Sequence, residues 1–184
     1  MKNISHVFLS FLFVTVFTFS KCKKENEEAQ LPPVTTVGAM TFGCKVDGKV
    51  FVPRDGRGKP GLFPTYTFLG NGPGGGWYLN IPATNWVPAA PEGLIIGTDS
   101  LLVSENTTYE FKLSDTYLRI KGTASANYSN GSDVYPKLNS ESGSLFISKF
   151  DPVNRILSGT FSFTGTNTNG KKVIVTDGRF DIKF

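Results

Sequence analysis

The sequence predicts an all-β protein whose folded part is an antiparallel β-sandwich or a small β-barrel-like domain. Short runs of aromatic and β-branched residues, which favour strands, alternate with clusters of Gly, Asn, Asp and Pro, which favour turns. Aromatic residues make up 13% of the chain, and no long window follows the helical period. The spacing of the runs indicates roughly nine to eleven strands in a single domain.

The first two hairpins are marked by their turns. Asp47 and Gly48 stand between two strand-forming runs, and this dipeptide is a strong signal for a type I′ turn. Further along, the runs 66–69 and 77–81 flank the glycine-rich segment 70–76, which predicts a second hairpin. The glycine run leads into a strand and lacks the Gly-Lys-Ser/Thr of a phosphate-binding loop, so we interpret it as a hairpin connection.

The remaining strands follow the same pattern. Further short strands are predicted at 94–96, 108–113, 117–123, 144–150, 156–164, 172–176 and 178–184. From Arg179 to Phe184 the even-numbered residues are apolar and the odd-numbered ones are charged, so Asp181 is expected to face water. The polar triplets at 106–108, 127–129 and 130–132 are expected in loops.

Residues 1–21 have the layout of a bacterial lipoprotein signal peptide. Lys2 precedes the apolar stretch 7–19, which would span about 20 Å as a helix, whereas the hydrocarbon core of a bilayer is about 30 Å thick. The segment ending in Cys22 resembles a lipobox, although Phe19 stands where Leu is usual and Lys21 where a small residue is usual. We predict that Cys22 is lipidated. The alternative is an ordinary secreted or membrane-retained segment with an incidental thiol.

The chain after the signal peptide divides into two parts. Residues 22–40 are expected to be the lipidated cysteine and a flexible tether, and residues 41–184 the β-rich domain. The acidic run at 25–28 resembles the signal for surface display in lipoproteins of the Bacteroidota. The expected location is the cell envelope, as an outer-membrane lipoprotein held to the membrane through the lipid on Cys22, with display at the cell surface as a further expectation.

Charge gives no indication of a nucleic-acid partner. The formal net charge is +4, and two of the basic residues lie in the predicted signal peptide. Beyond the tether the basic residues form no run or basic helix, so binding to nucleic acid is not expected. The cluster of Arg54, Arg57 and Lys59 lies among Gly and Pro, and we interpret it as a solvated loop, with an anion site as the alternative.

The sequence offers no catalytic residue, metal ligand or cofactor motif. The single histidine, His6, lies in the predicted signal peptide, so imidazole catalysis and histidine metal ligation are excluded for the mature chain. Cys44 has no disulfide partner if Cys22 carries lipid, and its position in a strand predicts a buried thiol. A carboxylate-based glycan-active enzyme would need two acids in one cleft, and turn positions alone explain Asp47, Asp115, Asp151 and Asp177.

The hypothesis of a binding site rests on three aromatic side chains close to loops rich in Gly or Pro. Exposed rings of Trp77, Tyr78 and Trp86 could stack on the faces of sugars. The alternative is that these rings fill the core or clamp loops. Because Trp77 alternates with Leu79 and Ile81, we expect it to be more buried than Trp86.

Three segments carry a resemblance to a family. They are TFGCKVDGKVFVP at 41–53, SGTFSF at 158–163 and IVTDGRFD at 174–181. The chain resembles a group of uncharacterised envelope lipoproteins of the Bacteroidota that share a domain of unknown function. The resemblance implies an envelope lipoprotein with a β-rich domain and supplies no activity. The function expected is a non-catalytic surface binding or accessory module, for glycans or peptides. The alternatives are a structural or assembly partner in the envelope and, last, a carboxylate-based enzyme.

Overall fold

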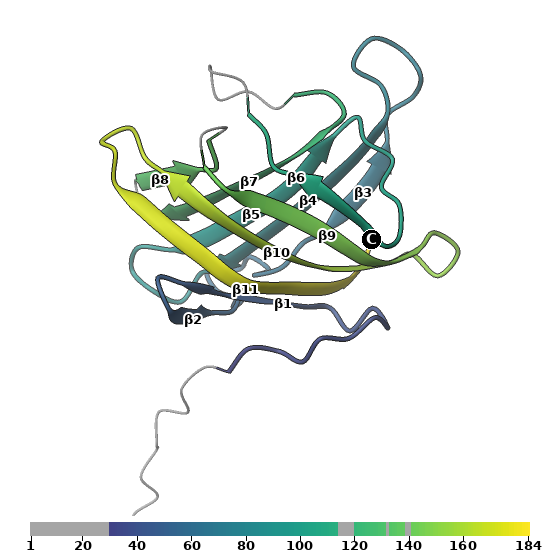
Figure 1. The fold of residues 1–184 in the computed structure, drawn as a ribbon. Helices are drawn as coiled ribbons and strands as arrows, with labels where there is room; N and C mark the ends of the chain where they lie inside the picture. The colour runs from purple at the N-terminus through teal and green to yellow at the C-terminus, as the bar shows by residue number, and fades with distance from the viewer. Residues whose placement is uncertain (1–29, 114–119, 132, 139–140) are drawn as a thin grey trace, which may run out of the picture.

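The computed structural model describes residues 30–113, 120–131, 133–138 and 141–184. Within them, eleven strands form two antiparallel sheets that lie face to face, and the sheets do not close into a barrel (Figure 1). The prediction of an all-β sandwich is confirmed. The described residues contain no helix of the length and hydropathy that a membrane span requires.

The two sheets are named A and B. Sheet A has the order β2-β1-β11-β10-β9-β6, from β1 (Thr41–Val46), β2 (Lys49–Phe51), β6 (Thr107–Glu110), β9 (Gly143–Asp151), β10 (Ile156–Thr166) and β11 (Lys172–Lys183). Sheet B has the order β3-β4-β5-β7-β8, from β3 (Thr65–Phe68), β4 (Trp77–Asn85), β5 (Glu92–Asp99), β7 (Thr123–Asn130) and β8 (Asp133–Pro136).

Both predicted hairpins are present. Asp47 and Gly48 join β1 to β2 with φ angles of 48° and 80°, as a type I′ turn requires. The main-chain N–H of Asp47 donates to the carbonyl of Ile174, and its Oδ1 accepts the N–H of Ile174 at 2.9 Å, which ties the turn to β11. In sheet B, Phe68 is paired with Trp77 across the glycine-rich connection.

The final two predicted strands are one strand. The runs 172–176 and 178–184 belong to β11, and the expectation of two separate strands is wrong. Against β10, Phe161 faces Gly178 and Phe163 faces Val175, so β11 carries an irregularity between its two halves. The one extra residue in β11 changes which side chains face inward, and this keeps both halves of β11 in the core.

Two further sequence-based expectations, a loop at 127–129 and a strand at 117–123, have separate outcomes. The triplet 127–129 was expected in a loop, but it lies inside β7. The expectation failed because Tyr128 points into the core while its polar neighbours lie on the opposite face of the strand. For the predicted strand at 117–123, residues 117–119 lie outside the described residues, and β7 begins at Thr123.

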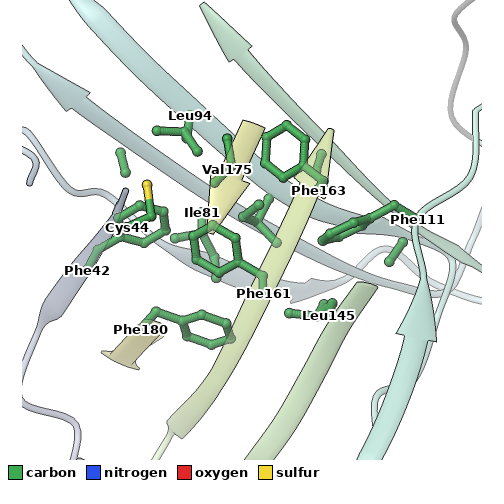
Figure 2. Close-up of a cluster of buried hydrophobic side chains, with 14 of the residues drawn as sticks. Phe42, Cys44, Ile81, Leu94, Phe111, Leu145, Phe161, Phe163, Val175 and Phe180 are labelled. Carbon is green, nitrogen blue, oxygen red and sulfur yellow. The ribbon is translucent and has the colours of Figure 1, made fainter. Parts of the chain in front are cut away.

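Aromatic rings from both ends of the chain meet between the sheets (Figure 2). The ring of Phe42 lies 5.2 Å from that of Phe161, centroid to centroid. Gly178 leaves room for the latter ring, because a Cβ at this glycine would lie 2.5 Å from its Cδ2 atom. Cys44 is fully buried, and burial raises the pKa of its thiol to about 12. The prediction of a buried thiol is confirmed.

Residues 30–40, here called the N-terminal strap, contact sheet A. The sequence placed them in the tether. Figure 1 shows this segment running beneath β1 and β11. A Cβ on Gly43 of β1 would lie 2.6 Å from the ring of Pro32, so the strap passes directly over the sheet. The side chain of Val34 lines a groove beside the strap.

Asp181 of β11 fastens the strap. Its carboxylate accepts hydrogen bonds from the hydroxyls of Thr35 (2.6 Å) and Ser158 (2.7 Å). It also accepts the three successive main-chain N–H groups of residues 37–39 at 3.0, 2.7 and 3.1 Å. Asp181 is only 1% exposed, so the prediction that it faces water is wrong. It does point to the outer face of sheet A, but the strap covers it there.

Candidate functional site

The three aromatic side chains predicted to bind a ligand do not form one site. Trp77 and Tyr78 open β4, and Trp86 follows its end. A strand rises by about 3.3 Å per residue, so the two tryptophans lie about 30 Å apart along β4. Trp77 and Tyr78 also point to opposite faces of sheet B, because side chains alternate along a strand.

Trp77 is held between two other rings. The ring of Tyr66 stacks on it at 4.9 Å and an interplanar angle of 22°, and the ring of Phe68 lies at 5.3 Å and 40°. Tyr66 in turn contacts Phe150 at 5.6 Å and Phe184 at 5.3 Å. These contacts make Trp77 part of an aromatic cluster at one end of the sandwich, which fits the structural alternative better than a sugar platform.

Tyr78 and Trp86 clamp loops. The hydroxyl of Tyr78 donates to the carbonyl of Gly74 in the glycine-rich connection. The indole N–H of Trp86 donates to the carbonyl of Pro60 at 3.0 Å, and the ammonium of Lys59 lies 4.6 Å from its ring centroid. The polar groups of both side chains are thus engaged within the protein.

The basic cluster near Trp86 has the same role. The guanidinium of Arg57 donates to the carbonyls of Pro88 and Ala89 at 2.8 and 2.9 Å. It therefore joins the loop before β3 to the loop before β5. Together with Lys59 on the Trp86 ring, this arrangement favours the interpretation as a loop over that as an anion site.

Two carboxylates line one cleft between the β1–β2 hairpin and sheet B. The cleft has a volume of about 190 Å³, and Asp47, Glu92 and Tyr128 are among its lining residues. Burial, followed by the charge of Glu92, raises the pKa of the Tyr128 phenol to about 12. Asp47 already accepts a hydrogen bond from β11. This bond engages one oxygen of Asp47, and the cleft holds it together with Glu92, which is the pair of carboxylates that a glycosidase would need in one site.

A larger groove lies on the outer face of sheet A, beside the strap. We call it the sheet A groove. It encloses about 350 Å³ and is lined by Val34, Ser144, Phe146, Thr160, Phe161, Ser162, Asp177, Gly178 and Arg179. Strand pairing places these residues side by side, because Ser144 faces Ser162, and Thr160 lies between Phe146 of β9 and Arg179 of β11.

The sheet A groove combines free hydroxyls with an apolar ring. Within the described residues, the hydroxyls of Ser144, Thr160 and Ser162 form no hydrogen bond with the protein. Each is a donor and an acceptor available to a ligand. Phe146 is partly exposed between them. A binding site for a polar small molecule typically has this composition, with an apolar surface and a few convergent polar groups.

Charged groups close one side of the sheet A groove. Lys45 forms an ion pair with Asp177 at 2.9 Å, and its hydrogen bond lowers the pKa of the Asp177 carboxyl. Arg179 donates from Nε to the carbonyl of Asp177 at 3.1 Å and from Nη1 to that of Pro32 at 3.4 Å. Both acceptors are main-chain carbonyls, so they fix the guanidinium without neutralising it.

The sequence interpretation missed this groove, although a signal was present. The strands 144–150 and 156–164 were predicted, and their outward positions hold Ser144, Phe146, Thr160 and Ser162. Reading the same face of both strands together would have revealed a row of hydroxyls around one ring. No feature of the sequence indicates that residues 30–40 contribute to the groove.

Comparisons with protein-family models, with curated proteins and with solved structures found no match to this chain. The resemblance to envelope lipoproteins therefore stays a prediction. Cys22, the predicted lipidation site, lies outside the described residues. Among the residues that the structure describes, no group of three or more His, Cys, Asp or Glu side chains is placed to hold a metal ion.

Proposed function

We propose that this chain is an outer-membrane lipoprotein of the cell envelope and serves there as a non-catalytic module that binds glycans. The sheet A groove is the proposed binding site. The N-terminal sequence supports the location, since a short apolar stretch precedes Cys22 and a charged tether follows it. The lipid on Cys22 would hold the domain at the membrane.

The observation that carries the binding proposal is the set of unpaired hydroxyls around Phe146. Sugars present hydroxyl groups along their edges and apolar C–H groups on their faces. Ser144, Thr160 and Ser162 match the edges, and the partly exposed ring matches a face. Strand pairing holds all four side chains on one rigid sheet, so little conformational entropy is lost when a ligand binds.

A glycan array tests the proposal. The mature chain in detergent should bind a subset of the arrayed glycans, and Phe146→Ala should reduce that binding at least tenfold. Phe63→Ala is the matched control, because Phe63 is 64% exposed and lies in sheet B's β3 region, away from the groove. The absence of any bound glycan, or equal losses for the two variants, would refute the groove as a glycan site.

The location has its own test. Mass spectrometry of the mature protein should find a diacylglyceryl group on Cys22 as the first residue, and Cys22→Ala should remain unprocessed. Lipid chains add about 0.8 kcal/mol per buried methylene, so the wild-type chain should stay in the membrane fraction at high salt. An unmodified Cys22 in the mature protein contradicts the proposal.

A role as an assembly partner is the second candidate, and one edge of sheet B favours it. β3 is the edge strand of sheet B, and Phe68 and Leu69 at its end are 45% and 61% exposed. An open edge strand can accept a strand from another protein. A photo-crosslinking amino acid at position 68 should then give a defined adduct in cells, and its absence would count against this candidate.

A further inference from the structure

Arg179 forms no ion pair within the described residues. Its guanidinium is held by the main-chain carbonyls of Pro32 and Asp177. Two acids lie two residues away from Arg179 along β11. The carboxylate of Asp177 is engaged by Lys45 at 2.9 Å, and that of Asp181 accepts five hydrogen bonds from Ser158 and the strap. The guanidinium is thus oriented but has no ion-pair partner, and its remaining N–H groups are free to bind a ligand.

Among the cationic groups around the sheet A groove, Arg179 is the one that has no ion-pair partner in the described residues. Lys45, Asp177 and Arg179 together contribute one positive charge. On the opposite side, Glu110 faces Ser144 across the β6–β9 pairing, and its carboxylate lies 3.8 Å from the ammonium of Lys112. That pair balances itself. The buried carboxylate of Asp181 under the strap offsets the charge of Arg179 in the sum, but it forms no ion pair with the guanidinium, so Arg179 is the cation left without a direct partner.

We infer that the sheet A groove selects acidic sugars, and this inference rests on the function proposed above. The anion of the sugar pairs with Arg179, its hydroxyls bond to Thr160 and Ser162, and one face of its ring lies on Phe146. A planar guanidinium matches a carboxylate with two parallel hydrogen bonds. The groove volume of about 350 Å³ falls within the range of small-molecule sites.

The N-terminal strap is part of this site. Pro32 supplies one of the two carbonyls that hold Arg179, and Val34 lines the groove. Asp181 fixes the strap through Thr35 and the three N–H groups that follow. The guanidinium is therefore held in place before a ligand arrives, which reduces the entropy lost on binding.

The test compares sugars that differ in charge alone. The mature chain in detergent is titrated with trigalacturonic acid and with its methyl ester, and the glycan array carries other acidic glycans with their neutral counterparts. Dextran sulfate against dextran separates recognition of a sulfate from recognition of a carboxylate. We expect the acid to bind at least about tenfold more tightly than the ester, because a charged hydrogen-bonded pair is lost in the ester.

Variants of the guanidinium make the test specific. Arg179→Gln should lower the affinity for the acid at least about tenfold and so remove the preference for the acid over its ester. Arg179→Lys should keep part of the preference, since an ammonium keeps the charge but cannot form the two parallel bonds. Arg54→Gln is the matched control, because Arg54 is exposed on another loop. It should bind as the wild type does.

The outcomes separate this inference from the proposed function. If acidic and neutral glycans bind equally and Phe146→Ala abolishes both, the groove binds glycans but does not select acidic ones, and the inference falls alone. If Arg179→Gln keeps the full preference for acid, the assignment of Arg179 falls. If no glycan of either kind binds, the proposed function falls with the inference.

Discussion

Replacing Asp181 with Asn should uncouple the strap from sheet A and lower the stability of the protein at neutral pH. The carboxylate accepts five hydrogen bonds and is 1% exposed. Burial raises its pKa, but the hydrogen bonds from Thr35, Ser158 and the main chain outweigh burial and lower the pKa from 3.8 to about 2. An Asn amide would place its own N–H groups against donors and leave some of them unpaired.

The lowered pKa of Asp181 sets the size of its contribution to the free energy of unfolding. The lowering of the Asp181 pKa from 3.8 to about 2, at about 1.36 kcal/mol per pH unit, corresponds to about 2 kcal/mol of stability linked to ionisation. Because the folded pKa of Asp181 is depressed, this contribution is fully present above about pH 4 and is lost as the pH falls toward 2. The free energy of unfolding of the wild type should fall more steeply over that window than that of Asp181→Asn.

Urea denaturation at a series of pH values between 7 and 2 measures both effects. At pH 7, Asp181→Asn should lose at least about 2 kcal/mol, and the gap between the two proteins should narrow below pH 4. Other carboxylates titrate in both proteins, so the difference isolates Asp181. Glu110→Gln, whose side chain is 77% exposed, should change stability by less than about 0.5 kcal/mol. A gap that does not depend on pH would refute the reasoning.

Three further predictions concern the core and the aromatic side chains. Gly178→Ala should cost about 1–3 kcal/mol in urea denaturation, because the new Cβ meets a phenylalanine ring, whereas Gly72→Ala, with nothing within 4 Å, should be close to neutral. The Cys44 thiol, with its pKa raised to about 12, should resist alkylation at pH 8 in the native protein and react after denaturation; labelling mapped to it in the native state would contradict its burial. Among single-tryptophan variants, the one that keeps Trp86 should be quenched more by acrylamide than the one that keeps Trp77, whose ring contacts Tyr66 and Phe68 and packs against the core; equal quenching would contradict this.

The elements that depend on short-range patterns were predictable. The Asp47-Gly48 turn needs two consecutive residues that tolerate positive φ, and this requirement is visible in the sequence. The alternation in β4 and the run of β10 likewise follow from the period of a strand. The irregularity in β11 was not predictable, since local composition does not say whether Asp177 and Gly178 end a strand or bulge from it.

Features that depend on contacts between distant segments were not predictable. The alternation from Arg179 to Phe184 correctly separates two faces of β11, but it cannot say what covers the outer one. Asp181 is buried by residues about 145 positions earlier in the chain. The sheet A groove has the same origin, because Val34, Ser144 and Arg179 become neighbours only through the pairing of β11 with β10 and the docking of the strap.

The predicted aromatic site failed for the converse reason, because residues that are close in sequence were expected to be close in space. Trp77, Tyr78 and Trp86 lie close in sequence, but a strand separates the two tryptophans in space. Ring contacts and hydrogen bonds then occupy the surfaces that a sugar would need. Chain proximity is a poor guide to sites in antiparallel sheets, where neighbours come from adjacent strands.

The attachment of the strap to Asp181 has a consequence for the order in which the chain can fold. The strap and β1 are synthesised before the other described strands, and both find their partners in β11, more than 120 residues later. Until β11 has been made, β1 has no place in sheet A beyond its short hairpin with β2. Docking of the strap and of β1 is therefore a long-range step that follows the synthesis of every other described strand.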